Sequence, residues 1–159
     1  MMDYSIREMR EAEYPLLEEF LYQAIFQRDT KKPIPRSVVN DPNINVYIRD
    51  FGNYPEDFCL CAETVAGIVG AVWIRNIKGF GSIDDQTPEF AISLLPDYRG
   101  YGIGTALMQA MIENLKTKSY SQTSLAVQKD NYALKMYLQV GFEIIDETAE
   151  EYIMRYRFK

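Results

Sequence analysis

The chain of 159 residues contains no histidine and only two cysteines, Cys59 and Cys61. Histidine is the commonest metal ligand and the commonest general base near neutral pH, so its absence argues against zinc-dependent hydrolysis and against a Ser-His-Asp triad. The two cysteines stand one residue apart in an expected strand, which places both side chains on the same face. We interpret them as small core residues rather than as a reactive or metal-binding pair.

Long apolar runs and an excess of positive charge are also missing. No stretch approaches the ~20 apolar residues that a membrane helix needs, and the first residues lack the apolar segment of a signal peptide. The 17 basic and 23 acidic residues give a net charge of −6, which disfavours nucleic acid as a partner. We therefore expect a soluble, cytoplasmic protein without a membrane or nucleic-acid partner, and the length predicts one domain over residues 1–159.

The spacing of apolar residues and turn residues predicts the order of helices and strands. Helices are expected over residues 12–26, 105–116 and 132–140, with another helical piece over 37–51. Strands are expected over residues 4–7, 58–63, 68–77, 89–95, 123–128, 142–146 and 152–158. This order predicts an α/β (α+β) fold with one mixed sheet of six to seven strands flanked by helices.

One short stretch joins an expected strand to an expected helix. Residues 94–105 read LLPDYRGYGIGT and hold three of the nine glycines, Gly100, Gly102 and Gly104. The first N–H groups of a helix lack internal partners and carry the positive end of its dipole, so they attract anions. Glycine lets an anion approach closely and tolerates positive φ, and Arg99 adds a fixed positive charge. The stretch predicts a phosphate-binding loop; a tight turn that lets the helix pack closely is the alternative.

Two common phosphate-binding motifs do not fit this loop. The pattern G-x-x-x-x-G-K-[ST] is absent, and the third glycine of G-x-G-x-x-G falls on Thr105. The spacing R-x-x-G-x-G does fit, with Arg99, Gly102 and Gly104. It resembles the coenzyme A pyrophosphate loop of the GNAT superfamily of N-acetyltransferases.

Two further segments carry the same resemblance. Residues 131–142, NYALKMYLQVGF, look like the family's N-x-x-A…Y…x-G-F segment, and residues 63–70, ETVAGIVG, look like its second and third strands. The resemblance implies an acyl-CoA N-acyltransferase fold of the GNAT type. It also implies an acyltransferase, EC class 2.3.1, that moves acetyl from acetyl-CoA directly to a primary amine without a metal.

The resemblance also implies which residues bind the co-substrate. The pyrophosphate would accept from N–H groups between Arg99 and Thr105, and the pantetheine arm would lie between two splayed parallel strands. The expected coenzyme A contacts are Leu94, Leu95, Arg99, Gly100, Gly102, Ile103, Gly104, Thr105 and Asn131. For Asn131, a helix N-cap is an equally good reading.

Two residues are expected to transfer protons in the reaction, one as a general acid and the other as a general base. Tyr137 matches a position at which family members aim a phenol at the thioester sulfur, where its O–H could protonate the leaving thiolate. A helix tyrosine packed against the sheet is the alternative. Because histidine is absent, the general base is a carboxylate, a tyrosine, or water that passes the proton out. The resemblance implies Glu89, at the start of the strand beside the co-substrate, where relatives carry a base that works through water, provided that burial raises its pKa. A solvated carboxylate at the strand edge is the alternative.

The acceptor is expected to be a small-molecule amine or an amine of a peptide or protein, and the resemblance allows a homodimer. The last hairpin carries an acidic run that could attract a cationic amine or form a solvated face: Glu143, Asp146, Glu147, Glu150 and Glu151. Four aromatic residues could line an acceptor pocket or belong to the core: Tyr22, Phe26, Tyr47 and Phe51. The alternative function is a non-catalytic acyl-CoA-binding module that regulates a partner.

Overall fold

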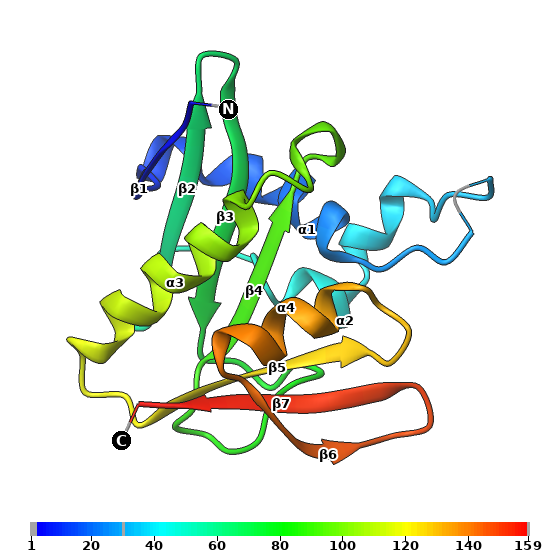
Figure 1. The fold of residues 1–159 in the computed structure, drawn as a ribbon, viewed down its shortest axis with the longest axis vertical. Coiled ribbons are helices and arrows are strands. Elements are labelled where there is room, and N and C mark those ends of the chain that lie inside the picture. Colours follow the sequence, from blue (N-terminus) through cyan, green and yellow to red (C-terminus); the bar gives the residue numbers. More distant parts are fainter. Residues whose placement is uncertain (1–2, 30, 159) are drawn as a thin grey trace.

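The computed structural model describes residues 3–29 and 31–158, and its centre is a seven-stranded sheet with helices on both faces (Figure 1). The strands are β1 (Ser5–Glu8), β2 (Phe58–Thr64), β3 (Gly67–Arg75), β4 (Glu89–Leu94), β5 (Gln122–Gln128), β6 (Glu143–Glu147) and β7 (Glu151–Arg157). The α-helices are α1 (Leu17–Ala24), α2 (Pro42–Asn45), α3 (Ile103–Lys116) and α4 (Ala133–Val140). Three 3-10 helices complete the list: η1 (Glu11–Leu16), η2 (Arg36–Asn40) and η3 (Pro96–Tyr98).

The order of strands across the sheet is β1-β2-β3-β4-β5-β7-β6. Every pair of described neighbours is antiparallel except β4 and β5, which run parallel. The prediction of a mixed sheet flanked by helices is therefore confirmed.

Alternation along the central strands divides the apolar side chains between two layers. On β2, Leu60 and Ala62 pack in the cluster that contains α3, whereas Cys59 and Cys61 pack in the cluster that contains α1. Both cysteines are free and buried, and burial raises the pKa of the Cys59 thiol. The expectation that they are core residues on one face is confirmed.

Helix α3 covers one face of the sheet with the repeat that the sequence predicts. Leu107, Met111 and Leu115 are fully buried, and each contributes roughly 1.5–3 kcal/mol by leaving water. The helix begins at Ile103, two residues before the expected start, because Gly102 takes a left-handed conformation with φ of 84° and serves as the N-cap. No helix within the described residues is long and apolar enough to span a bilayer.

The N-terminal helical region differs from the prediction of one helix over residues 12–26. Pro15 lies inside η1, and because proline lacks an N–H and crowds the preceding turn, the α-helix begins only at Leu17. Helix α1 ends at Ala24, and Ile25 is extended with φ of −77° and ψ of 121°. The helical piece expected over residues 37–51 is also wrong, because η2 and the short α2 replace it and turns follow.

Strands β4 and β5 meet at one residue pair and then diverge (Figure 1). Glu89 of β4 pairs with Ser124 of β5, whereas β5 pairs with β7 along its whole length. Thr123 Oγ1 donates to the carbonyl of Pro88 at 2.9 Å, and Ser124 Oγ donates to that of Gly81 at 2.7 Å, which fixes this end of the pair. Because β5 stays paired with β7 while it diverges from β4, a gap opens in the sheet toward the carboxyl ends of β4 and β5.

A charged cluster ties η1 to the edge of the sheet. Arg7 on β1 donates to both carboxylate oxygens of Glu13, at 2.9 and 2.8 Å, and also to Glu63 on β2. The hydrogen bonds from Arg7, and then the N–H of Arg10, lower the pKa of Glu13 to about 2.

Glu13→Gln should therefore destabilise the protein at pH 7, and its difference from the unsubstituted protein should shrink in acid. A carboxylate whose pKa falls on folding stabilises the native state above its unfolded pKa of ~4.3, and that stabilisation disappears as pH drops toward the folded pKa. Urea unfolding at pH 7, 4 and 3 measures the difference. The exposed Glu11 of the same 3-10 helix supplies the control, Glu11→Gln, and a difference independent of pH would refute the assignment.

Candidate active site

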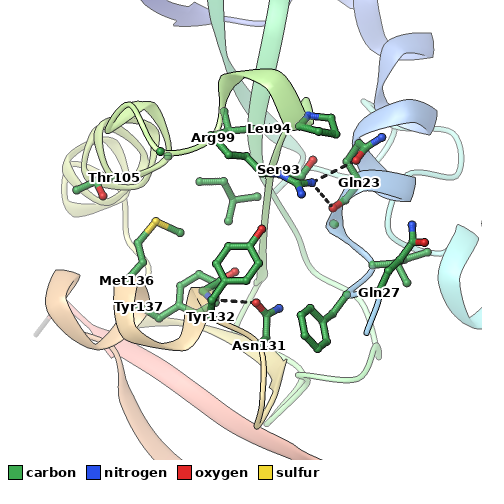
Figure 2. A pocket seen from close by; sticks show the side chains of 18 of the residues that line it. Gln23, Gln27, Ser93, Leu94, Arg99, Thr105, Asn131, Tyr132, Met136 and Tyr137 are labelled. Atoms are coloured by element: carbon green, nitrogen blue, oxygen red, sulfur yellow. Dashed lines mark hydrogen bonds between the residues drawn. The ribbon is translucent and has the colours of Figure 1, made fainter. Parts of the chain in front are cut away.

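A cavity of about 540 Å³ lies at the carboxyl end of β4 (Figure 2). Ile92, Ser93 and Leu94 of β4 line it from the sheet, and the loop before α3 and one face of α4 form two further walls. The end of α1 and the extended residues that follow it form the opposite wall. Arg99 is the only charged side chain among the described residues that line this cavity.

The glycines of the loop before α3 have two different roles. Gly100 and Gly102 both have φ of 84°, a conformation that favours glycine, and a Cβ built on either would meet nothing within 4 Å. Their main chain therefore faces open space. A Cβ on Gly104 would instead meet Met136 Sδ at 3.4 Å and Leu94 Cδ1 at 3.6 Å, so this glycine lets α3 approach its neighbours.

The N-terminus of α3 lies at the cavity, and its first main-chain N–H groups have no partner within the helix. The first hydrogen bond of the helix runs from the N–H of Ala106 to the carbonyl of Gly102 at 3.1 Å, so the N–H groups of residues 103–105 precede it. The N–H of Arg99, which was expected to bind an anion, instead donates to the carbonyl of Pro96 at 3.3 Å. The N–H groups that remain for an anion thus begin at Gly100.

The side chain of Arg99 reaches across the cavity to the end of α1 (Figure 2). Its Nη2 donates to Oε1 of Gln23 at 3.2 Å and to the carbonyl of Gln23 at 3.4 Å. Both partners are uncharged, so the positive charge of the guanidinium is left for an anion bound at the loop.

Tyr137 lines the cavity from α4. Its ring packs edge-on against Phe142, with ring centroids 5.8 Å apart. Burial raises the pKa of the phenol above its ordinary value, so the hydroxyl is protonated at neutral pH, and no described residue is hydrogen-bonded to it. A protonated phenol without a protein partner, on the wall of a cavity, can donate its proton to a bound group.

Asn131 lies where the connection from β5 enters α4. Its Oδ1 accepts from the N–H of Ala133 at 2.9 Å, and the residue also lines the cavity (Figure 2). The helix starts one residue later than expected, with Tyr132 at the N-cap position, but the side chain of Asn131 still satisfies an N–H of the first turn. The capping role is thus present, and a contact with coenzyme A stays a prediction.

Three of the expected site residues do not line the cavity. Ile103 is fully buried in the core. The N–H of Leu95 donates to the carbonyl of Val69 at 2.9 Å and continues the pairing of β4 with β3. Glu89 is the third, at the closed end of the gap between β4 and β5.

The carboxylate of Glu89 is buried and makes three hydrogen bonds. Its Oε1 accepts from the hydroxyl of Tyr47 at 2.8 Å and from the N–H of Gly81 at 2.9 Å, and its Oε2 accepts from the N–H of Gly79 at 2.6 Å. Burial raises the pKa of Glu89, although the three hydrogen bonds oppose that rise. The alternative of a solvated carboxylate is therefore wrong, because the side chain is enclosed by the loop that follows β3.

The remaining sequence-based candidates separate clearly in the structure. Of the four aromatic residues, only Phe26 lines the cavity. Tyr22 donates to the carbonyl of Ile34, and Phe51 packs against Tyr14. The acidic run does not line the cavity, and two of its members are ion-paired, Glu143 with Arg155 and Glu147 with Lys129. Within residues 3–29 and 31–158, no three metal-binding side chains gather in one place.

Sequence reasoning missed two parts of the cavity wall. Gln23 and Ile25 were hidden because the helix expected over residues 12–26 continued through them, and no glycine or proline marks its true end. Gln27 directly follows the expected helix and was not considered. Ala133 and Met136 could have been found, because Ala133 lies four residues before Tyr137 on the same helix and Met136 lies three residues after Ala133.

Proteins of known activity or structure resemble this chain. A ribosomal protein bS18-alanine N-acetyltransferase of Haemophilus influenzae is 36% identical over 81 residues, which are 49% of this chain and 56% of that enzyme. The chain thus matches little more than half the length of that relative.

Two solved structures share the fold over almost the whole chain. The PaiA N-acetyltransferase of Thermoplasma acidophilum, in complex with coenzyme A, has a TM-score of 0.69 at 19% identity and covers 98% of this chain and 99% of its own. The yncA protein of Salmonella typhimurium, with its cofactor acetyl-CoA, has a TM-score of 0.68 at 15% identity and covers 99% and 95%. The sequence profile of the Acetyltransferase (GNAT) family matches residues 7–142, and the chain belongs to this family.

Proposed function

We propose that this protein is an acetyl-CoA-dependent N-acetyltransferase that transfers the acetyl group directly to a primary amine. One observation carries the proposal: the glycine-rich start of α3 and the phenol of Tyr137, which has no hydrogen bond to a described residue, line the same cavity beside the gap between β4 and β5. A diphosphate at the loop and a thioester near Tyr137 would be joined by an arm that follows this gap.

The residues present fit a thioester that carries a diphosphate. The loop offers main-chain N–H groups, two glycines whose main chain faces open space, and the guanidinium of Arg99. Beyond Glu89 the edge of β4 has no strand partner among the described residues on the β5 side, so its main chain can bond to an amide-containing arm. When bound, acetyl-CoA supplies an activated acyl group and a thiolate leaving group.

In this proposal Tyr137 acts on the leaving sulfur. Its pKa lies above the usual value, so the phenol is protonated throughout the neutral range. As the bond between carbon and sulfur breaks, the O–H donates to the developing thiolate, whose ordinary pKa is ~8.5. The amine that attacks the carbonyl loses a proton in the same reaction and so restores the balance of protons.

The amine must first be neutral. An amine with a pKa of ~10 is about one-thousandth neutral at pH 7, which corresponds to ~4 kcal/mol. No carboxylate lines the cavity among the described residues, so the proton leaves through water, and we propose Glu89 as the base that receives it by this route. A buried carboxylate with a raised pKa suits that task.

Glu89→Gln should lower the free energy of unfolding by about 1–3 kcal/mol, because the new amide would turn an N–H donor toward one of the three donors that the carboxylate now satisfies. Urea unfolding at pH 7 measures this loss, and the exposed Glu18 gives the control variant, Glu18→Gln. Unchanged stability would contradict the hydrogen bonding described above.

The same variant tests the proposed role of Glu89 as the base. The rise of the rate with pH that reports the pKa of Glu89 should disappear in the folded Glu89→Gln protein, and an unaltered pH profile would exclude that role.

The proposed function is tested by following thiol release from acetyl-CoA with a panel of acceptors. The panel contains small primary amines, a polyamine, amino acids and peptides with a free N-terminus, including one that begins with alanine because of the name of the Haemophilus influenzae relative. Release that depends on an acceptor supports the transferase. Binding of acetyl-CoA without release for any acceptor would point to a non-catalytic module. Homodimer formation and a cytoplasmic location stay predictions.

A further inference from the structure

Arg99 is the residue through which the loop before α3 touches the far wall of the cavity. One nitrogen of its guanidinium, Nη2, contacts both the side-chain oxygen and the carbonyl of Gln23. That carbonyl belongs to the last turn of α1, where helix carbonyls lack internal partners and a cation is favoured by the helix dipole. The contact thus gives the carbonyl of Gln23 a hydrogen-bond donor and fixes the direction of the Arg99 side chain across the cavity (Figure 2).

A second set of contacts fixes the amide of Gln23. Its Nε2 donates to Oε2 of Glu19 at 2.8 Å, so its Oε1 is the atom that faces Arg99. Glu19 in turn accepts from Nη1 of Arg36 on η2, at 2.5 and 2.7 Å. A chain of four polar side chains therefore runs from η2 through α1 to the loop, and each member orients the next.

We propose that Gln23 is a positioning residue that holds the guanidinium of Arg99 ready for the diphosphate of coenzyme A; the inference rests on the proposed function. Arg99 is an exposed side chain with many rotamers, and holding it in place before binding removes part of the entropy cost of ordering it. Gln23 contacts only Nη2, so Nε and Nη1 can face the phosphate oxygens. Because Gln23 is neutral, it orients the charge without neutralising it.

Gln23→Leu should weaken coenzyme A binding about three- to tenfold, the range expected for immobilising one flexible side chain. Binding of pantetheine, which has no phosphate, should not change. Isothermal titration of both compounds measures the two affinities. Gln23→Glu should weaken coenzyme A binding at least as much, because a carboxylate would pair with Arg99 and repel the diphosphate.

Gln27→Leu is the matched control, because Gln27 lines the same cavity but its Oε1 accepts from the N–H of Ile34 and does not contact Arg99. On an Arg99→Gln background, Gln23→Leu should cause no further loss of coenzyme A affinity. Full coenzyme A affinity in Gln23→Leu, or an equal loss for pantetheine, would overturn the inference and leave the proposed function intact. Failure of the unsubstituted protein to bind coenzyme A would overturn both.

Discussion

Phenylalanine in place of Tyr137 should lower kcat for acetyl transfer about 100-fold or more, with little change in affinity for acetyl-CoA. The substitution removes only the hydroxyl, which has no hydrogen-bond partner among the described residues and which in our proposal donates its proton to the leaving thiolate. The edge-on packing of the ring against Phe142 is kept, so the fold should be unaffected. Steady-state kinetics with an acceptor found in the panel, together with titration of acetyl-CoA, separates the two quantities.

Tyr132→Phe is the control for this experiment. Tyr132 lines the same cavity from the start of α4 but is 69% exposed, so it loses the same hydroxyl from a position open to water. Its kcat should stay within a few-fold of that of the unsubstituted protein. A rate in Tyr137→Phe equal to that of this control would remove Tyr137 from the mechanism and leave the leaving thiolate without an assigned proton donor.

Valine in place of Gly102 should reduce coenzyme A affinity about 100-fold or more. Gly102 has φ of 84° and its main chain faces the open cavity, so a branched side chain would both strain the turn and enter the space assigned to the diphosphate. Loss of two charge-assisted hydrogen bonds, at roughly 1.5 kcal/mol each, corresponds to this change in affinity. Titration calorimetry measures the affinity, and circular dichroism during heating reports whether the variant is folded.

A second glycine gives a closely matched control for Gly102. Gly67, the first residue of β3 after the turn from β2, has φ of 111° and also has nothing within 4 Å of a built Cβ, but it does not line the cavity. Gly67→Val should therefore lose a similar ~1–2 kcal/mol of stability and keep its affinity for coenzyme A. Equal affinities in the two variants would defeat the assignment of the loop.

The parts of the fold that could be predicted are those in which the signal is local. The repeat in α3 and the glycines before it lie within a few residues of one another, and together they predicted a strand, a loop and a helix that the structure contains. The end of α1 could not be predicted, because Ile25 leaves the helix in an extended conformation and no glycine or proline there marks the change.

The surroundings of Glu89 could not be predicted, because its side-chain partner is distant in the chain. Its phenolic partner, Tyr47, lies 42 residues earlier in the chain, and its main-chain partners come from a loop whose path depends on the sheet. From the sequence we could predict that burial must raise the pKa of Glu89 if it acts as a base. The groups that enclose its carboxylate could not be predicted. The same holds for Gln23, which meets Arg99 from 76 residues away.

The single residue pair between β4 and β5 joins two antiparallel parts of the described sheet, one formed by β1 to β4 and the other by β5, β7 and β6. Both parts contribute to one apolar core, which includes Ile92 from the first part and Leu125 and Met154 from the second. The two parts are therefore held together more by side-chain packing than by main-chain pairing. An extended, amide-containing arm that lay between the facing edges of β4 and β5 would act as an interposed strand and complete the sheet.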